Sequence, residues 1–114
     1  MTVKLSGQDG RLKRQKLMEA MRSEALTEIG GRNILAVRDY KSGLRTDRST
    51  HRTSDTGLPV SDVVYYELDG GWCCARPSGT EPKVKFYFGV CEETAEAAEE
   101  GLAALRQALE ALAA

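Results

Sequence analysis

The pattern of apolar and polar positions near the start of the chain is that of an amphipathic helix. Four apolar residues follow the i, i+1, i+4, i+8 spacing of a buried helical stripe: Leu17, Met18, Met21 and Ala25. This spacing, with basic side chains around it, predicts a helix over residues 9–29. Ser6 or Asp9 can cap its start, and Gly30 and Gly31 supply its end.

A short apolar run follows the predicted helix. Residues 34–37 (Ile-Leu-Ala-Val) are apolar at every position, which is typical of a strand covered on both faces or nearly so. Residues 41–60 instead have few apolar positions and many Ser, Thr, Gly, Asp and Arg residues. We therefore expect a long polar loop there, closed by Leu58 and Pro59.

Three segments with a period of two come next and predict three strands. In the first, one face carries Val64, Tyr66 and Leu68, and residues 69–71 (Asp-Gly-Gly) turn the chain. In the second, one face carries Trp72, Cys74 and Arg76, and the other carries Cys73 and Ala75. In the third, an apolar face of Val84, Phe86, Phe88 and Val90 is opposite a face of Lys83, Lys85 and Tyr87.

The last segment, residues 94–114, is rich in Ala and Leu and predicts a second helix. Its apolar seam advances by steps of three or four residues: Ala98, Leu102, Leu105, Leu109 and Leu112. A coiled-coil partner is one use of such a seam, but the pattern spans barely two heptads. Docking of the helix onto the chain's own sheet is therefore the favoured interpretation.

The predicted order is helix, strand, long loop, three strands and helix. Strands joined by short loops pair antiparallel, and two amphipathic helices need a sheet face to cover. The predicted fold class is therefore α+β, a two-layer sandwich of a four-stranded, mainly antiparallel sheet flanked by two helices. The 114 residues suit one domain. A domain of this size buries a hydrophobic core and needs no metal ion or disulfide to be stable.

Composition excludes several function classes. Sixteen Lys and Arg residues against seventeen Asp and Glu residues give a net charge of −1, which argues against a general nucleic-acid binder or a membrane-surface domain. No apolar run approaches the roughly 20 residues of a transmembrane helix, and the start lacks the apolar core of a secretory signal. Three cysteines, two of them adjacent, suggest no disulfide framework. We expect a reduced, cytoplasmic domain.

The charge is distributed unevenly along the chain. Residues 1–60 carry twelve basic and seven acidic side chains, a balance of +5. Residues 61–114 carry four basic and ten acidic side chains, a balance of −6. Two solvated faces of opposite sign explain this simply. Alternatively, the basic half faces an anionic ligand or partner.

The segment 76–83 (Arg-Pro-Ser-Gly-Thr-Glu-Pro-Lys), which joins the last two predicted strands, has the features of an oxyanion-binding loop. Pro77 and Pro82 stiffen it, and Gly79 allows a close ligand approach or a positive φ. We expect the backbone amides of residues 78–81 to be available as donors, because a concave set of amides binds anions. Arg76 adds a planar guanidinium that suits a phosphate.

An ordinary hairpin loop is the alternative interpretation, because Pro-Ser-Gly-Thr is common loop chemistry. Glu81 also opposes anion binding unless its carboxylate turns away, for instance toward Lys83 or Lys85. The composition of the loop leaves both interpretations open.

The same loop, followed by residues 84–88 (Val-Lys-Phe-Tyr-Phe), resembles the C-terminal domain of the α-D-phosphohexomutases, the phosphoglucomutase and phosphomannomutase family. Supporting similarity lies in residues 31–33 and 38–40 around the first predicted strand and in residues 58–62 before the next one. The resemblance covers nearly the whole chain from about Ser6. Its loop is most similar to that of the bacterial phosphoglucomutase branch.

In that family this domain is the fourth and last, with a fold likened to the TATA-binding protein, and its loop holds the phosphate that is not being transferred. The resemblance implies an interdomain linker at residues 1–8 and a phosphate-binding domain at residues 9–114. It implies a hexose phosphate as substrate and the upstream domains of the same enzyme as partners, with no nucleic acid and no membrane. Carried over by position, the phosphate-binding residues are Arg76, Ser78, Gly79, Thr80 and, in a lesser role, Lys83.

Other parts of the family's machinery do not occur in this sequence. They are the phosphoserine segment Ser-His-Asn-Pro, the magnesium loop Asp-x-Asp-x-Asp-Arg and the sugar-recognition loop, and in the family all three belong to upstream domains. The resemblance therefore places Mg²⁺ and catalysis upstream, and it implies no catalytic residue, no metal site and no activity for this chain alone. The chain is then a piece of a longer mutase or a degenerate stand-alone domain.

The remaining candidates carry weaker signals. His51 has no carboxylate or Cys at ligand spacing, which predicts a solvated loop histidine and no metal site. Ser78 has no neighbouring base that would make it a nucleophile. Three cysteines form no Cys-x-x-Cys pair and are expected on the sheet or in the core: Cys73, Cys74 and Cys91. Three arginines of the polar loop form a solvated face or border a cleft: Arg45, Arg48 and Arg52.

Two further function classes stay open. A stand-alone binding module would hold a phosphorylated metabolite without catalysis. The acidic second half and the single tryptophan disfavour nucleic acid as its ligand. A structural protein would instead use the last helix for oligomerisation.

Overall fold

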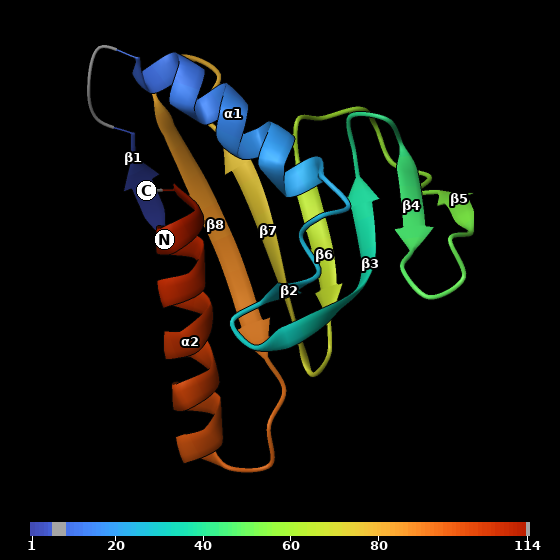
Figure 1. Ribbon diagram of the computed structural model, residues 1–114, viewed down its shortest axis with the longest axis vertical. Coiled ribbons are helices and arrows are strands. Elements are labelled where there is room, and N and C mark those ends of the chain that lie inside the picture. The colour runs from blue at the N-terminus through green and yellow to red at the C-terminus, as the bar shows by residue number, and fades with distance from the viewer. Residues whose placement is uncertain (6–8, 114) are drawn as a thin grey trace.

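An antiparallel sheet carries both helices on one of its faces (Figure 1). The computed structural model describes residues 1–5 and 9–113. The helices are α1 (Gly10–Arg22) and α2 (Ala95–Ala113). The strands are β1 (Thr2–Lys4), β2 (Glu28–Ile29), β3 (Arg32–Asp39), β4 (Leu44–Asp47), β5 (Thr53–Asp55), β6 (Val64–Leu68), β7 (Gly71–Pro77) and β8 (Lys83–Val90). Helix α1 packs on β6, β7 and β8, and α2 packs on β8 and β2.

The four predicted strands form the centre of the sheet. They are adjacent in the order β8-β7-β6-β3, and each neighbouring pair is antiparallel. The α+β class and the two flanking helices are therefore confirmed. The sheet has eight strands rather than four, because β1 pairs with β8, β4 and β5 continue beyond β3, and β2 forms a short second pairing with β3.

The long polar loop predicted over residues 41–60 is wrong over part of its length. This segment contains β4 and β5, which pair antiparallel. All three residues of β5 are exposed, and Figure 1 shows the pair beyond the part of the sheet that the helices cover. Backbone hydrogen bonds rather than burial hold such strands, so they leave no hydrophobic alternation in the sequence.

The first helix is shorter than predicted. Helix α1 ends at Arg22, where Ser23 takes an extended conformation (φ −74°, ψ 138°) and its amide donates to the Ala20 carbonyl. Residues 30 and 31 do not end a helix but turn the chain from β2 into β3, with φ of 62° and 78°. Ile29 is buried as part of β2, at 2% exposure. Burial of this strand outweighs the helical spacing of the residues before it.

Apolar side chains of the helices and one sheet face enclose the core. The largest fully buried ones include Tyr66, Phe86, Met21, Ile29, Leu105 and Leu109. The two leucines belong to α2, which confirms that this helix docks on its own sheet. Coverage of residues 34–37 on both faces is wrong: Leu35 is 50% exposed, because the helices cover one face only. Among the described residues, no helix has the length and apolar character that a membrane crossing requires.

The chain before α1 includes an edge strand. Strand β1 pairs with β8, with Thr2 opposite Lys85 and Lys4 opposite Lys83. The predicted cap Ser6 lies outside the described residues, and Asp9 occupies the N-cap without a side-chain hydrogen bond. The division into a linker at residues 1–8 and a domain at residues 9–114 stays a prediction.

Candidate phosphate-binding site

The β7–β8 loop lies at the end of the sheet where α1 begins (Figure 1). It borders a surface hollow of about 360 Å³, lined by Arg76, Pro77, Ser78, Gly79, Glu81, Lys83 and Lys85. Four of the five residues predicted to bind phosphate line this hollow. The fifth, Thr80, belongs to the loop but not to the lining.

Two cations lie side by side on the strands that flank the loop. The register pairs Arg76 of β7 with Lys85 of β8, and both side chains are exposed. In the part of the chain that the structure describes, neither forms an ion pair with a carboxylate. Like charges opposite one another destabilise a sheet, whereas they attract an anion placed between them. The sequence analysis missed Lys85 as a site residue, because only the β7–β8 register places it beside Arg76.

The prediction of four available amides in the loop is wrong. The Ser78 amide donates to the Lys83 carbonyl at 2.9 Å, and the amides of Thr80 and Glu81 donate to the Ser78 hydroxyl oxygen at 3.4 Å and 3.2 Å. The cause is a local turn, in which a serine oxygen accepts from amides two and three residues later. Among the described residues, only the Gly79 amide of these four has no partner. The two bonds to Ser78 are at or beyond the long end of the usual range and are therefore weak.

The carbonyl groups of the loop are held on the side facing α1. Arg14 donates through Nη1 to the Ser78 carbonyl and, at 2.8 Å, to the Glu81 carbonyl. The Leu5 amide donates to the Pro82 carbonyl at 2.7 Å. The loop thus turns the negative ends of these dipoles toward the protein, while Ser78 and Gly79 line the hollow. The sequence analysis did not connect Arg14 with the loop, because the two are 64 residues apart.

Two glycines differ in the space around them. A Cβ at Gly10 would lie 2.6 Å from the Leu5 carbonyl oxygen and 2.7 Å from the Pro82 Cβ, so glycine is what lets α1 start against the loop. A Cβ at Gly79 would meet nothing within 4 Å. Gly79 also has no positive φ. Of the two reasons predicted for Gly79, only a close ligand approach remains.

Glu81 lines the hollow together with the cations, so the partner of its carboxylate matters for anion binding. Its carboxylate pairs with Lys83 at 2.6 Å, as one of the two predicted orientations has it. The hydrogen bond and charge of Lys83 lower the pKa of Glu81, which therefore stays ionised at neutral pH. Lys83 accordingly neutralises an acidic neighbour and contributes less free charge than Arg76.

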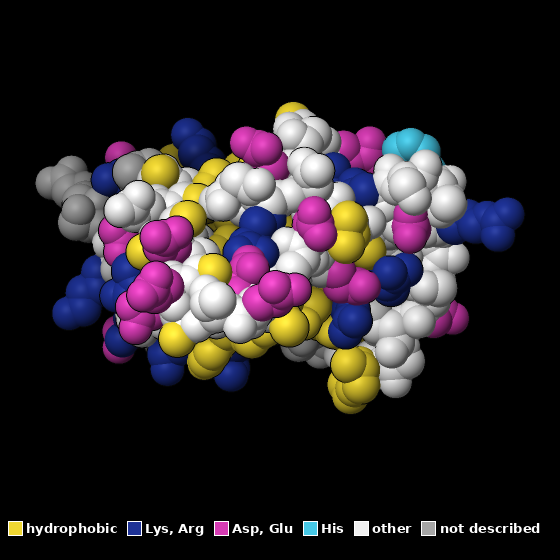
Figure 2. All heavy atoms as spheres, turned by 90° about the horizontal axis from the view of Figure 1, so that it is seen from below, with side chains coloured by type: hydrophobic (Ala, Val, Ile, Leu, Met, Phe, Trp, Pro, Cys, Tyr) yellow, Lys and Arg dark blue, Asp and Glu magenta, His cyan; other side chains and the backbone are white. Residues whose placement is uncertain are grey.

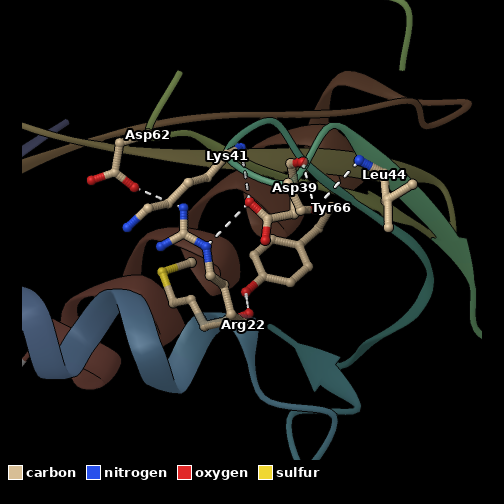
Figure 3. Close-up of polar contacts among 8 residues, drawn as sticks. Arg22, Asp39, Lys41, Leu44, Asp62 and Tyr66 are labelled. Carbon is tan, nitrogen blue, oxygen red and sulfur yellow. Dashed lines mark hydrogen bonds and ion pairs between the residues drawn. The ribbon is translucent and has the colours of Figure 1, made fainter. Parts of the chain in front are cut away.

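A second polar cluster ties the end of α1 to the sheet (Figure 3). Arg22 donates to Asp39 at 3.2 Å and to Asp62 at 2.7 Å. Beside it, the buried hydroxyl of Tyr66 donates to the Met21 carbonyl. Asp39 and Asp62 come from the two segments, 38–40 and 58–62, that support the family resemblance. Because the guanidinium is engaged by both carboxylates, this cluster fixes α1 in place.

The other candidates lie apart from the hollow. His51 is exposed in the β4–β5 turn, as predicted, with a φ of 57°. All three cysteines are free, and burial raises the pKa of the Cys73 thiol to about 12. Arg45 bonds Glu67 at 2.6 Å and 3.1 Å. The hollow is lined by none of the predicted trio Arg45, Arg48 and Arg52. Among the described residues, no group of His, Cys, Asp or Glu could hold a metal ion.

Half of the ten acidic residues of the second half gather at the end of the molecule opposite the loop. Figure 2 views the molecule from this end and shows Asp and Glu side chains around the start of α2. Five glutamates belong to this region: Glu92, Glu93, Glu96, Glu99 and Glu100. The helix dipole favours a negative charge in the first turn, where Glu96 lies. The hollow is therefore at the end of the molecule away from the acidic patch.

Comparison with known proteins shows the family of the chain. A model of the family described as "Phosphoglucomutase/phosphomannomutase, C-terminal domain" matches residues 11–108. The phosphoglucomutase of Staphylococcus epidermidis is 38% identical over 84 residues, which are 74% of this chain and 15% of that protein. The phosphoglucomutases of Staphylococcus saprophyticus and Staphylococcus haemolyticus are 34% identical over 84 residues and 31% identical over 90 residues. These matches cover 74% and 79% of this chain, but only 15% and 16% of those relatives. The chain therefore belongs to the family of phosphoglucomutase/phosphomannomutase C-terminal domains.

Proposed function

We propose that this chain is the domain of a phosphoglucomutase or phosphomannomutase that holds the non-transferred phosphate of a hexose phosphate. The observation that supports this best is a pair of cations, Arg76 and Lys85, beside the open Gly79 amide in one hollow. A dianionic phosphate needs several donors at once, and each charge-assisted hydrogen bond contributes about 1.5–3 kcal/mol. One loop and its two flanking strands supply such a set.

Binding requires only a local change in the loop. A phosphate oxygen in place of the Ser78 hydroxyl oxygen accepts the hydrogen bonds of the Thr80 and Glu81 amides. The Ser78 hydroxyl, which donates to no described residue, donates to the same phosphate, and Gly79 adds its own amide. Arg76 offers two parallel N–H groups to the phosphate. Because the replaced bonds are long and weak, this exchange costs little.

The contribution of this domain to the reaction is positioning. Contacts with a non-reacting phosphate supply binding energy that is used at a distant reacting centre, and orientation lowers the barrier further. The chain contains neither the phosphoserine segment nor, in its described part, a cluster of metal ligands. We therefore assign catalysis and Mg²⁺ to other domains of a longer cytoplasmic enzyme, and we expect the chain alone to be inactive.

Titration of the isotope-labelled chain with glucose 1-phosphate, followed by NMR, tests the proposal. The amides of residues 78–81 should shift, and glucose without phosphate should shift none of them. Arg76→Ala should raise the Kd about tenfold or more, since a charged hydrogen bond is lost. Arg52→Ala removes the same charge near the opposite edge of the sheet and should leave the Kd unchanged. Shifts confined to other regions, or equal affinity of Arg76→Ala and wild type, would contradict the assignment.

A further inference from the structure

We propose that Arg14 is a positioning residue for the phosphate-binding loop. It holds the loop in the shape in which the loop's amides, rather than its carbonyls, are offered to an anion. This inference rests on the proposed function of the loop. No part of the sequence pattern assigns Arg14 a role, because it reads as one of several basic residues around the stripe of α1.

The geometry is that of a bridge across the loop. One nitrogen of Arg14, Nη1, donates to the carbonyls of both Ser78 and Glu81. These two residues delimit the tip, so a single side chain fixes the separation of its ends. We call this contact the Arg14 bridge. It also directs both carbonyl oxygens toward α1, away from the position of a bound anion.

Helix α1 gives the bridge a rigid base. Arg14 itself is partly buried, and the helix turn that follows it carries the buried residues Leu17 and Met18. Gly10, at the start of the same helix, lies against Pro82 at the end of the loop. The loop is therefore supported at several points from the α1 side.

The opposite side of the loop offers no comparable support. A Cβ at Gly79 would meet no atom within 4 Å, so the tip is open there. Within the loop, the bonds to the Ser78 hydroxyl are 3.2 Å and 3.4 Å long. Two shorter bonds close the base of the loop, from the Ser78 amide to the Lys83 carbonyl at 2.9 Å and from the Lys83 amide to the Glu81 carbonyl at 2.8 Å. Without the Arg14 bridge, the Ser78 carbonyl would have no donor among the described residues and would be free to turn toward the hollow and repel an anion.

Arg14 also contributes charge behind the amides. In this contact its guanidinium is paired with two neutral carbonyls and not with a carboxylate, so its positive charge is not cancelled there. A positive charge on the protein side of the loop strengthens the attraction of a phosphate on the other side. The contacts of Arg14 with the loop and its positive charge therefore both favour phosphate binding.

The test uses the 114-residue chain, inorganic phosphate and four proteins: wild type, Arg14→Met, Arg14→Gln and a control, Arg11→Met. Arg11 is exposed on the same helix, and its replacement removes one positive charge while leaving the bridge intact. We expect Arg14→Met to raise the phosphate Kd about tenfold, the scale of one lost charged hydrogen bond. We expect Arg11→Met to stay within about twofold of wild type, since screening weakens exposed charges.

Hydrogen exchange separates positioning from general stability. In Arg14→Met the Ser78 amide should exchange faster, while the amide of the buried Cys73 in the interior strand β7 and the thermal midpoint stay near the wild-type values. If Arg14→Met does not fold, Arg14→Gln provides the same comparison, because a glutamine is too short to bridge both carbonyls and carries no charge.

The outcomes distinguish the two proposals. If wild type binds phosphate and neither Arg14 variant changes the Kd or the Ser78 exchange, the role of Arg14 is overturned and the proposed function stands. If wild type binds neither inorganic phosphate nor glucose 1-phosphate, the proposed function fails and the positioning role fails with it.

Discussion

At the scale of single residues, Gly10 and Gly79 are glycines for different reasons. Gly10 is required by the fold, because any side chain there would collide with Leu5 and Pro82. Gly79 is not required by the fold, since it has open space around its Cα and an ordinary φ. The reason for glycine at position 79 therefore lies outside the folded chain, in whatever approaches the loop from solvent.

Replacement of each glycine by alanine separates these roles. Gly79→Ala should not lower the free energy of unfolding, because alanine fits there and restricts the unfolded chain. It should weaken glucose 1-phosphate binding, because its methyl group occupies the path of the phosphate. Gly10→Ala should lower the free energy of unfolding by about 1–3 kcal/mol through overpacking. Denaturant unfolding and NMR titration of both variants measure these effects. A destabilised Gly79→Ala, or one that binds like wild type, would refute the role given to Gly79.

At the scale of elements, the β4–β5 hairpin shows how polar contacts replace a hydrophobic face. The Asp47 carboxylate accepts from the Ser49 amide at 2.9 Å, the Ser49 hydroxyl at 2.8 Å and the Thr50 amide at 3.1 Å. These bonds, with the Thr50 amide foremost, lower the pKa of Asp47 from 3.8 to about 2. The ionised carboxylate thus holds the turn that contains His51.

This pKa predicts how the hairpin responds to acid. A carboxyl whose folded pKa is depressed contributes stability above its unfolded pKa and loses it as pH falls toward its folded pKa. The contribution of Asp47 should therefore be complete above about pH 4 and disappear toward about pH 2. The Ser49 and Thr50 amide shifts should titrate with a midpoint near 2, and Asp47→Ala should abolish that titration. A midpoint near 4 would show that the carboxylate is not held by these bonds.

Elements were predictable from the sequence where they bury an apolar stripe. The alternation of β6, β7 and β8 and the seam of α2 follow directly from which side chains reach the core. Strands β1 and β5 are the edges of the sheet, and β4 lies next to β5 beyond the cover of the helices. None of the three contains a fully buried side chain, so their sequences carry no such signal. The end of α1 was missed for a related reason: the helical spacing continues to Ala25, but the burial of Ile29 in β2 decides the path of the chain.

At the scale of the whole molecule, the candidate site depends on how the two layers meet. The loop, Arg76, Ser78 and Gly79 could be found from sequence, because they are contiguous. Arg14 and Lys85 could not, since one reaches the loop only when α1 packs on the sheet and the other joins Arg76 only through the β7–β8 register. The availability of the amides was also misjudged, because a turn centred on the Ser78 side chain occupies them.

The packing of the two layers makes a prediction for α2. Leu109 is fully buried against the sheet, whereas Leu102, on the same predicted seam, is 38% exposed. Leu109→Ala should lower the free energy of unfolding by about 2–5 kcal/mol, because it leaves a cavity. Leu102→Ala should cost less than about 1 kcal/mol. Denaturant unfolding of both variants measures the difference. Equal losses would mean that the seam serves a partner rather than the chain's own sheet.

The strand at residues 2–4 has a consequence for handling the protein. With Met1, which exchanges two hydrogen bonds with Phe86, it covers the outer edge of β8, the strand that carries Lys85. Removal of this strand would expose unpaired backbone N–H and C=O groups along β8. Strands of other molecules pair with such an edge, which leads to aggregation. Precipitation or poor ligand binding by a chain shortened at its N-terminus would therefore result from the exposed β8 backbone and not from a defect in the binding residues.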